Sequence, residues 1–134
     1  MKPPAQGPGD KTLPTPDPAQ VQLIRSYGPG RFLIGDRDWH QPVLVSPAST
    51  TAWKVARADE LALANIEPLL AVMPPVELLV VGCGARAVFM APAVRAALKG
   101  AGMVLEVADT GSACRTYNVL VAEGRRAAAA LIPL

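Results

Sequence analysis

MVLEVADTGSACRTYNVLVAEGRR, residues 103–126, is the stretch that decides the fold. Its first part carries the apolar residues Val104, Leu105 and Val107 and predicts a strand that ends at Asp109-Thr110-Gly111. The residues that follow predict a helix. Polar side chains and free backbone N–H groups converge where a strand passes into a helix. This junction is therefore the candidate binding site of the chain.

A second strand and helix precede this stretch. Residues 77–82 form a continuous aliphatic run that predicts a central strand buried on both faces, and Gly82-Cys83-Gly84 ends it. A helix with Pro92 at an early position follows and ends near Gly100. Strand, helix, strand and helix over residues 76–124 predict a parallel β-α-β crossover of right-handed sense.

The first half of the chain predicts short antiparallel strands. Residues 21–27 and 31–34 are strand-like on either side of the turn signal Gly28-Pro29-Gly30, which predicts a hairpin. Residues 43–45 predict a further short strand, and residues 50–55, rich in β-branched and aromatic side chains, predict another. We expect these segments together to form an antiparallel β layer.

The secondary structure of two further segments, residues 58–73 and 127–134, is predicted from weaker patterns. Between Ala58 and Met73 the apolar residues recur at helical spacing, which predicts a helix with a break near Asn65 and with Pro68 in the first turn of a second short helix. The final residues, 127–134, allow two structures. Their alanines favour a helix, whereas their aliphatic end suits a buried strand that closes the sheet.

Size and composition indicate one globular domain with a tail. The chain has 134 residues, 51% of them hydrophobic, which is enough for a single core over residues 20–134. Residues 1–19 are rich in proline and contain one large aliphatic residue, Leu13. This segment predicts a disordered or loosely docked tail.

Charge and hydropathy argue against several classes of partner. The 13 basic and 11 acidic residues give a net charge of +2, too even for a nucleic-acid footprint. No apolar run reaches the roughly 18 to 20 residues of a membrane span. The first residues have neither the apolar core of a signal peptide nor the basic amphipathic pattern of a mitochondrial targeting segment. We therefore expect a cytoplasmic protein.

Four motifs carry a resemblance to a known family. They are Ser26-Tyr27-Gly28, Gly82-Cys83-Gly84, the run Asp109-Thr110-x-x-Ala113-Cys114-Arg115-Thr116-Tyr117-Asn118-x-Leu120, and Glu123-Gly124-Arg125-Arg126. Over about residues 21–132 the chain resembles a domain family of unknown function. That family includes mitochondrial complex I assembly factor 3 and many uncharacterised bacterial and archaeal proteins.

The resemblance implies a three-layer α/β domain. Its mixed central sheet has a last strand antiparallel to the others, and a β-hairpin layer accompanies it, so residues 127–132 become a strand. Eukaryotic members of the family help to assemble respiratory complex I and are not known as enzymes. The family has no established catalytic residues that could be transferred to this chain. A bacterial protein is the simpler interpretation of a sequence without a targeting pattern.

The glycine turn after the first central strand has two interpretations. Residues 82–87 fit the pattern G-x-G-x-x-A, a variant of the dinucleotide fingerprint, and Asp109 ends the next strand where a ribose-binding carboxylate would lie. The fingerprint also needs a helix that starts within the glycine loop, whereas Pro92 places the helix start later. We favour a tight turn that packs against the neighbouring loop.

The junction itself allows a capping or a binding role. Asp109, Thr110 and Ser112 are all residue types that cap helices, and Arg115 could join the free amides in holding an anion. Helical spacing places Arg115 and Asn118 on a face different from that of the sheet-facing residues. We favour structural hydrogen bonds to neighbouring loops for these two residues, which are also the best candidates in the chain for contact with a ligand or partner.

The sequence shows no reactive constellation. Cys83 and Cys114 are expected to be buried, inert thiols, since two cysteines and the single histidine, His40, are too few for a metal site. We therefore expect no cofactor and a non-enzymatic protein-interaction or assembly module. The alternative is a small-molecule or anion-binding protein, or an unrecognised enzyme. Its crevice at the strand ends would be lined by Gly82, Gly84, Asp109, Thr110, Arg115 and Asn118.

Overall fold

The computed structural model describes residues 21–134, so the tail predicted over residues 1–19 lies outside the described part. The strands are β1 (Ile24–Gly28), β2 (Arg31–Ile34), β3 (Arg37–Trp39), β4 (Val43–Val45), β5 (Thr50–Ala52), β6 (Leu78–Gly82), β7 (Val104–Ala108) and β8 (Ala127–Leu131). The α-helices are α1 (Glu67–Leu70), α2 (Pro92–Gly100) and α3 (Thr110–Ala122), and 3-10 turns lie at Ala58–Glu60 and Leu63–Asn65.

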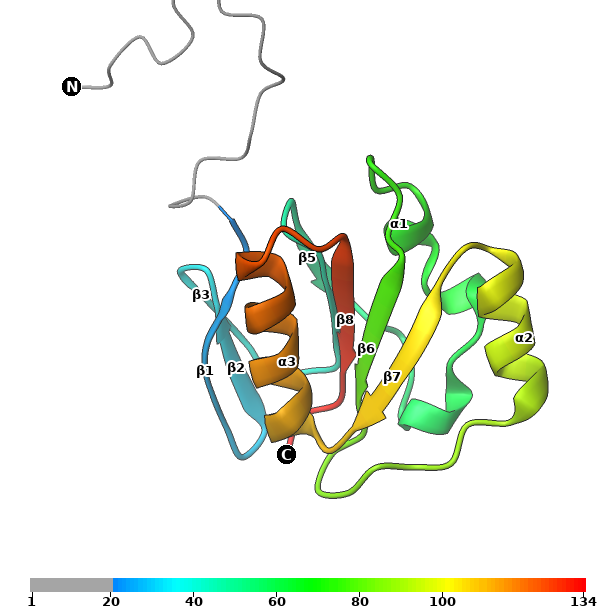
Figure 1. Cartoon of the computed structure of the whole chain (residues 1–134). Coiled ribbons are helices and arrows are strands. Elements are labelled where there is room, and N and C mark those ends of the chain that lie inside the picture. The colour runs from blue at the N-terminus through cyan, green and yellow to red at the C-terminus, as the bar shows by residue number, and fades with distance from the viewer. Residues whose placement is uncertain (1–20) are drawn as a thin grey trace, which may run out of the picture.

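A five-stranded mixed sheet, in the order β5-β4-β8-β6-β7, forms the centre of the domain (Figure 1). β6 pairs in parallel with β7 on one side and with β8 on the other. The middle residues of β6, from Leu79 to Val81, are at most 1% exposed, which confirms the prediction of a strand buried on both faces. The parallel β6-α2-β7 crossover is confirmed as well.

The direction of the last strand differs from the one that the resemblance implied. β8 is antiparallel to β4, but it is parallel to β6 and therefore runs in the same direction as β7. α3 carries the chain back along the sheet between the end of β7 and the start of β8. A strand-helix-strand connection of this kind returns the next strand in the same direction. The antiparallel member of the sheet is β4.

Tertiary packing also makes residues 127–131 a strand despite their alanine content. Ala128, Ala129 and Ala130 are fully buried between β4 and β6, where both neighbours satisfy their backbone groups. Small side chains on this strand let α3 lie close to the sheet. Burial and the two hydrogen-bonded ladders outweigh the helix propensity of alanine, which is a weak determinant by itself.

The N-terminal strands divide between two sheets, whereas the sequence predicted one antiparallel layer. β1, β2 and β3 form a separate antiparallel meander that contains the predicted hairpin. β4 and β5 instead join the edge of the central sheet. The reason is visible in β4, whose three residues are all buried, as expected of a strand covered on both faces.

The helix predicted from Ala58 is wrong, whereas the break near Asn65 and the second short helix after it are confirmed. This segment forms two 3-10 turns and the four-residue helix α1, with Pro68 in its first turn as predicted. Ala62 has an extended backbone and interrupts the helix, and its N–H donates to Asn65 Oδ1 at 3.2 Å in place of a helical carbonyl. Glu60 Oε1 accepts from Arg57 N at 2.8 Å and so caps the first 3-10 turn separately.

Two apolar clusters on opposite faces of the central sheet complete the three layers. One contains Tyr117 of α3 and Phe32 of the meander, which pack with Val80 and Ala129 on the same face. The other lies under α1, α2 and the 3-10 turns and contains Trp53 and Leu98. Figure 1 shows α3 in front of the sheet beside the meander. The predicted three-layer architecture is confirmed. Within residues 21–134, none of the helices combines the length and apolarity needed to cross a bilayer.

Candidate functional site

Asp109 caps the N-terminal end of α3 with both of its carboxylate oxygens. Oδ1 accepts a hydrogen bond from Ser112 N at 2.9 Å, and Oδ2 accepts one from Ser112 Oγ at 2.8 Å. These bonds, above all that from the backbone N–H, hold the pKa of the Asp109 carboxyl below its usual value. The capping role predicted for this residue is what the structure shows.

Thr110 is fully buried and joins three segments of the chain. Its Oγ1 accepts from Gly84 N at 2.8 Å and donates to Ile132 O at 2.6 Å. Its backbone N–H also donates to Gly84 O, at 2.8 Å. The Thr110 hydroxyl therefore forms hydrogen bonds with both the glycine turn and the segment after β8.

Gly82 lies where the end of β6 passes beneath α3. A methyl group at this position would lie 2.9 Å from Leu131 Cδ2 and 3.0 Å from Thr110 Oγ1. The space beside Gly82 is therefore already filled by protein. Gly84 has a φ of +96°, which glycine adopts without strain. The helix after this turn begins only at Pro92, so the helix N-terminus that a dinucleotide fingerprint needs is absent from the glycine loop.

Asn118 and Tyr117 attach α3 to the beginning of the meander. Asn118 Oδ1 accepts from Ile24 N at 3.0 Å, and Asn118 Nδ2 donates to Ile24 O at 2.8 Å. The Tyr117 hydroxyl donates to Gln22 O at 2.7 Å. Both polar atoms of the Asn118 side chain are therefore used in structural hydrogen bonds, the role that we favoured for this residue.

Arg115 is the exposed member of the predicted set. Its Nη1 donates to the Tyr27 hydroxyl at 2.7 Å and its Nη2 to Ser112 Oγ at 3.3 Å. Gly111 makes this approach possible, because a methyl group there would lie 2.8 Å from the Tyr27 hydroxyl oxygen. The structure thus brings Gly82, Gly84, Asp109 and Thr110 together in a packed junction, with Arg115 and Asn118 along the adjoining side of α3.

Both cysteines are free thiols in the described chain. Burial raises the pKa of the Cys114 thiol to about 12, and it also raises the pKa of Cys83 above its ordinary value. Such thiols remain protonated at neutral pH and are poor nucleophiles and poor metal ligands. Residues 21–134 contain no group of three or more His, Cys, Asp or Glu side chains placed to hold a metal ion.

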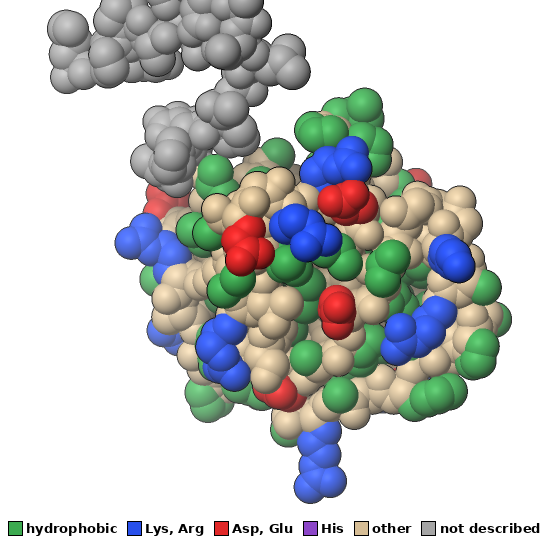
Figure 2. Space-filling view, in the orientation of Figure 1, with side chains coloured by type: hydrophobic (Ala, Val, Ile, Leu, Met, Phe, Trp, Pro, Cys, Tyr) green, Lys and Arg blue, Asp and Glu red, His purple; other side chains and the backbone are tan. Residues whose placement is uncertain are grey.

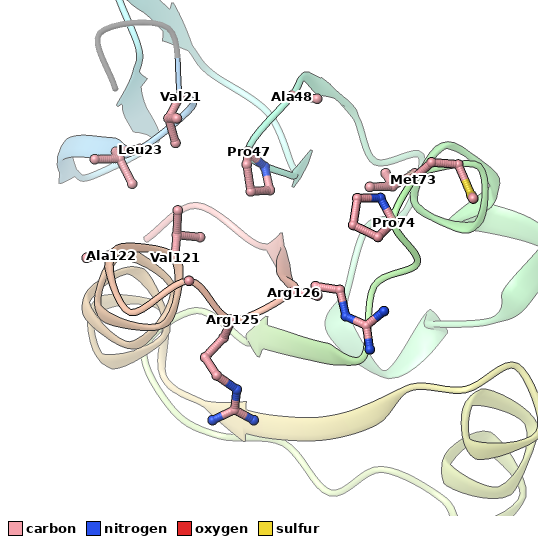
Figure 3. Close-up of a pocket in the computed structure, with 12 residues that line it drawn as sticks. Val21, Leu23, Pro47, Ala48, Met73, Pro74, Val121, Ala122, Arg125 and Arg126 are labelled. Carbon is pink, nitrogen blue, oxygen red and sulfur yellow. The ribbon is translucent and has the colours of Figure 1, made fainter. Parts of the chain in front are cut away.

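A pocket of about 570 Å³ lies at the opposite end of the central sheet, where β6 and β8 begin (Figure 3). Segments far apart in sequence form its mostly apolar wall: Val21 and Leu23 before β1, residues 47–48 after β4, 72–74 after α1, and 121–122 at the end of α3. Gly124, Arg125 and Arg126, which connect α3 to β8, complete it. Figure 3 shows the Arg125 and Arg126 side chains on the same side of this pocket.

Glu77 fixes the two arginines at the edge of the pocket. Arg126 Nη2 donates to Glu77 Oε2 at 2.8 Å, and Arg125 Nε lies 3.9 Å from Glu77 Oε1. The Arg126 guanidinium holds the pKa of the Glu77 carboxyl below its ordinary value. One carboxylate thus faces two guanidinium groups, and Figure 3 shows both arginine side chains directed away from the apolar wall of the pocket.

The pocket could not be predicted from the sequence, because the residues that line it share no motif or period. The only signal was the adjacent pair Arg125-Arg126 within one of the family motifs. Figure 2 shows that charges of both signs are interspersed on the face it displays.

Comparison with known proteins places the chain in a family. The model of the family described as "Protein of unknown function (DUF498/DUF598)" matches residues 24–132. NADH dehydrogenase [ubiquinone] 1 alpha subcomplex assembly factor 3 of Danio rerio is 37% identical over 111 residues, which are 83% of this chain and 64% of that protein. The chain thus spans less than two thirds of this relative's length. An uncharacterised protein of Rhodobacter capsulatus is 35% identical over 83% of this chain and 84% of its own length.

The fold has also been observed in solved structures. The solution structure of a Bordetella pertussis protein described as a Mth938-like domain superposes with a TM-score of 0.73. It is 26% identical in sequence, and the superposition covers 92% of each chain. Family match, sequence identity and fold agree, and the chain belongs to the DUF498/DUF598 family, as its motifs had suggested.

Proposed function

We propose that this chain is a non-enzymatic protein-interaction module that assists the assembly of a respiratory NADH dehydrogenase. Several of its relatives are named as assembly factors of that enzyme. The observation that carries the proposal is the 37% identity to one of these factors over 83% of the chain. We further propose that it acts in the cytoplasm of a bacterium, on a protein partner.

The chemistry of the strand-end junction supports a role without catalysis. Asp109 and Thr110 have the polar groups that a reaction could use, but both already bond to protein groups that the fold needs. The Cys114 thiol is buried and stays protonated. An interaction module needs none of these groups to be reactive.

The alternative of an anion or small-molecule site at the same junction has less support. The Ser112 N–H at the start of α3 is occupied by Asp109, and the space beside Gly82 is filled by Leu131 and Thr110. Arg115 presents an exposed cation beside the start of α3, but it already donates to Tyr27 and Ser112.

Deletion of the gene in its own bacterium tests the assembly role. We expect native electrophoresis of the membranes to show less intact NADH dehydrogenase and more subcomplexes, with full recovery when the wild-type gene is returned. The activity of another respiratory enzyme in the same membranes serves as control. Unchanged amounts of the intact complex in the deletion strain would contradict the proposal.

A further inference from the structure

The N-terminal tail, residues 1–19, joins the described domain at the wall of the pocket. Val21, the first described residue, lines the pocket. The next residue, Gln22, is held in place by its backbone: its N–H donates to Pro47 O at 3.0 Å, and its C=O accepts from the Tyr117 hydroxyl at 2.7 Å. Its Oε1 also accepts from Thr50 Oγ1, at 3.1 Å. The chain therefore enters the domain at a fixed point beside the pocket.

We propose that the pocket binds a segment of the chain's own tail, residues 13–18, whose sequence is Leu-Pro-Thr-Pro-Asp-Pro. Pro16 and Pro18 occupy its apolar interior, and Leu13 covers its rim. This inference does not depend on the proposed function, because it rests on the lining of the pocket, on the point where the chain enters the domain and on the sequence of the tail.

The lining of the pocket suits a proline-rich segment better than an ordinary peptide. The side chains of Arg125 and Arg126 are directed away from the apolar wall (Figure 3), and the other lining residues are aliphatic side chains, prolines, a methionine and a glycine. A peptide brings N–H groups into this space, and the lining offers few partners for them. Three of the residues 13–18 are prolines, which have no backbone N–H. The segment therefore leaves few donors without a partner.

The connection between the tail and the pocket is short. Pro18 lies three positions before Val21, and Leu13 lies eight positions before it. At the roughly 3.1 Å per residue of polyproline II, the conformation that alternating prolines favour, these distances are about 9 Å and at most about 25 Å. A short tether of this kind gives an effective concentration of about millimolar. Weak affinity is then sufficient for binding, and the stiffness that the prolines give the segment reduces the entropy that it loses.

The rim of the pocket offers a partner for Leu13. Met73 lines the pocket and is 81% exposed, although methionine is usually buried. Leu13 is the one large aliphatic residue of the tail. Contact between these two side chains removes apolar surface from water on both sides, which the hydrophobic effect favours.

NMR relaxation of the full chain tests the proposal. We expect backbone order parameters above about 0.6 for Thr15 and Asp17, and lower values for Ala5 and Gln6, which lie outside the docking segment. We also expect nuclear Overhauser effects between the proline rings of residues 14–18 and the side chain of Val121. Equal order parameters in the two parts of the tail, or the absence of these Overhauser effects, would overturn the proposal.

Variants at exposed positions separate docking from an effect on the fold. Ala122→Trp should fill the pocket and lower the order parameters of Thr15 and Asp17 to those of Gln6, whereas Ala96→Trp in α2 should leave them unchanged. Ordered residues 13–18 in the Ala122→Trp protein would show that the tail does not use this pocket.

A change within the tail gives a second test that cannot unfold the domain. Leu13→Ser should lower the order parameter of Thr15 and shift the amide signal of Met73, whereas Pro4→Ser should change neither. A second copy of the chain is the other candidate occupant. It would appear as a dimer in sedimentation that Ala122→Trp dissociates, with order parameters in residues 13–18 that rise with protein concentration, and that result would also overturn the proposal.

Discussion

The side-chain amide of Asn118 in α3 forms two hydrogen bonds with the backbone of Ile24, which lies 94 residues earlier in the chain. It thereby gives the N–H and the C=O of Ile24 a partner outside the β1–β2–β3 sheet. The meander is thus attached to the helix layer by polar contacts as well as by its apolar face.

Replacement of Asn118 by alanine should loosen this attachment. Asn118→Ala removes both bonds and leaves two backbone groups of Ile24 without a partner, so we expect the free energy of unfolding to fall by about 1–3 kcal/mol. Urea denaturation measures the change. Val119→Ala, at a neighbouring position that is 54% exposed, should cost less than about 0.5 kcal/mol. Equal losses in the two variants would show that the amide is not a structural clamp.

A side chain at Gly82 should be excluded by packing. In Gly82→Ala the new methyl group would lie within 3.0 Å of Leu131 and Thr110, and overpacking of this kind costs about 1–3 kcal/mol. Gly100→Ala is the matched control, because nothing lies within 4 Å of a methyl group at Gly100. Thermal unfolding should show a lower Tm for the first variant and an equal or higher Tm for the second. If both variants keep the wild-type Tm, α3 does not need to lie so close to β6.

The hydroxyl of Thr110 should matter more than its volume. Thr110→Val keeps the shape but leaves Gly84 N–H and Ile132 C=O without their buried partner, which we expect to cost about 1–3 kcal/mol in urea denaturation. The same change at the exposed residue Thr116 should be nearly neutral. A stable Thr110→Val protein would mean that water replaces the hydroxyl at this junction.

The buried thiol of Cys114 should make stability fall at alkaline pH. Its pKa is raised from 9.0 to about 12 in the folded protein, so the unfolded chain releases this proton at lower pH than the folded one. Stability from this source is therefore intact below pH 9 and decreases as the pH rises from about 9 towards 12. Urea denaturation at pH 8 and pH 10.5 should show a smaller decrease for Cys114→Ala than for the wild type. Parallel decreases in both proteins would rule out this thiol as the cause.

Local patterns were sufficient for several elements and for part of the site. Pro92 and Gly100 mark the bounds of α2, and the aliphatic run before Gly82 is β6. A side-chain cap at the start of α3 was also predictable, although the sequence allowed Asp109, Thr110 or Ser112 and the structure selects Asp109. The continuous helix predicted from Ala58 to Asn65 failed because Ala62 is extended and gives its N–H to the Asn65 side chain, an interruption that apolar spacing does not reveal.

What the sequence by itself determined is the chemistry of short stretches: the strand-to-helix junction at Asp109, the buried central strand and the family motifs. The tertiary structure alone decided the role of Asn118, the direction of β8 and the existence of the pocket beside Arg125 and Arg126. Each of these depends on which distant segments come into contact. The residues around Asn118 do not indicate that its hydrogen-bond partner is Ile24. Local propensity acts over a few residues, whereas the sheet order that joins β4, β8 and β6 is set by burial across the whole chain.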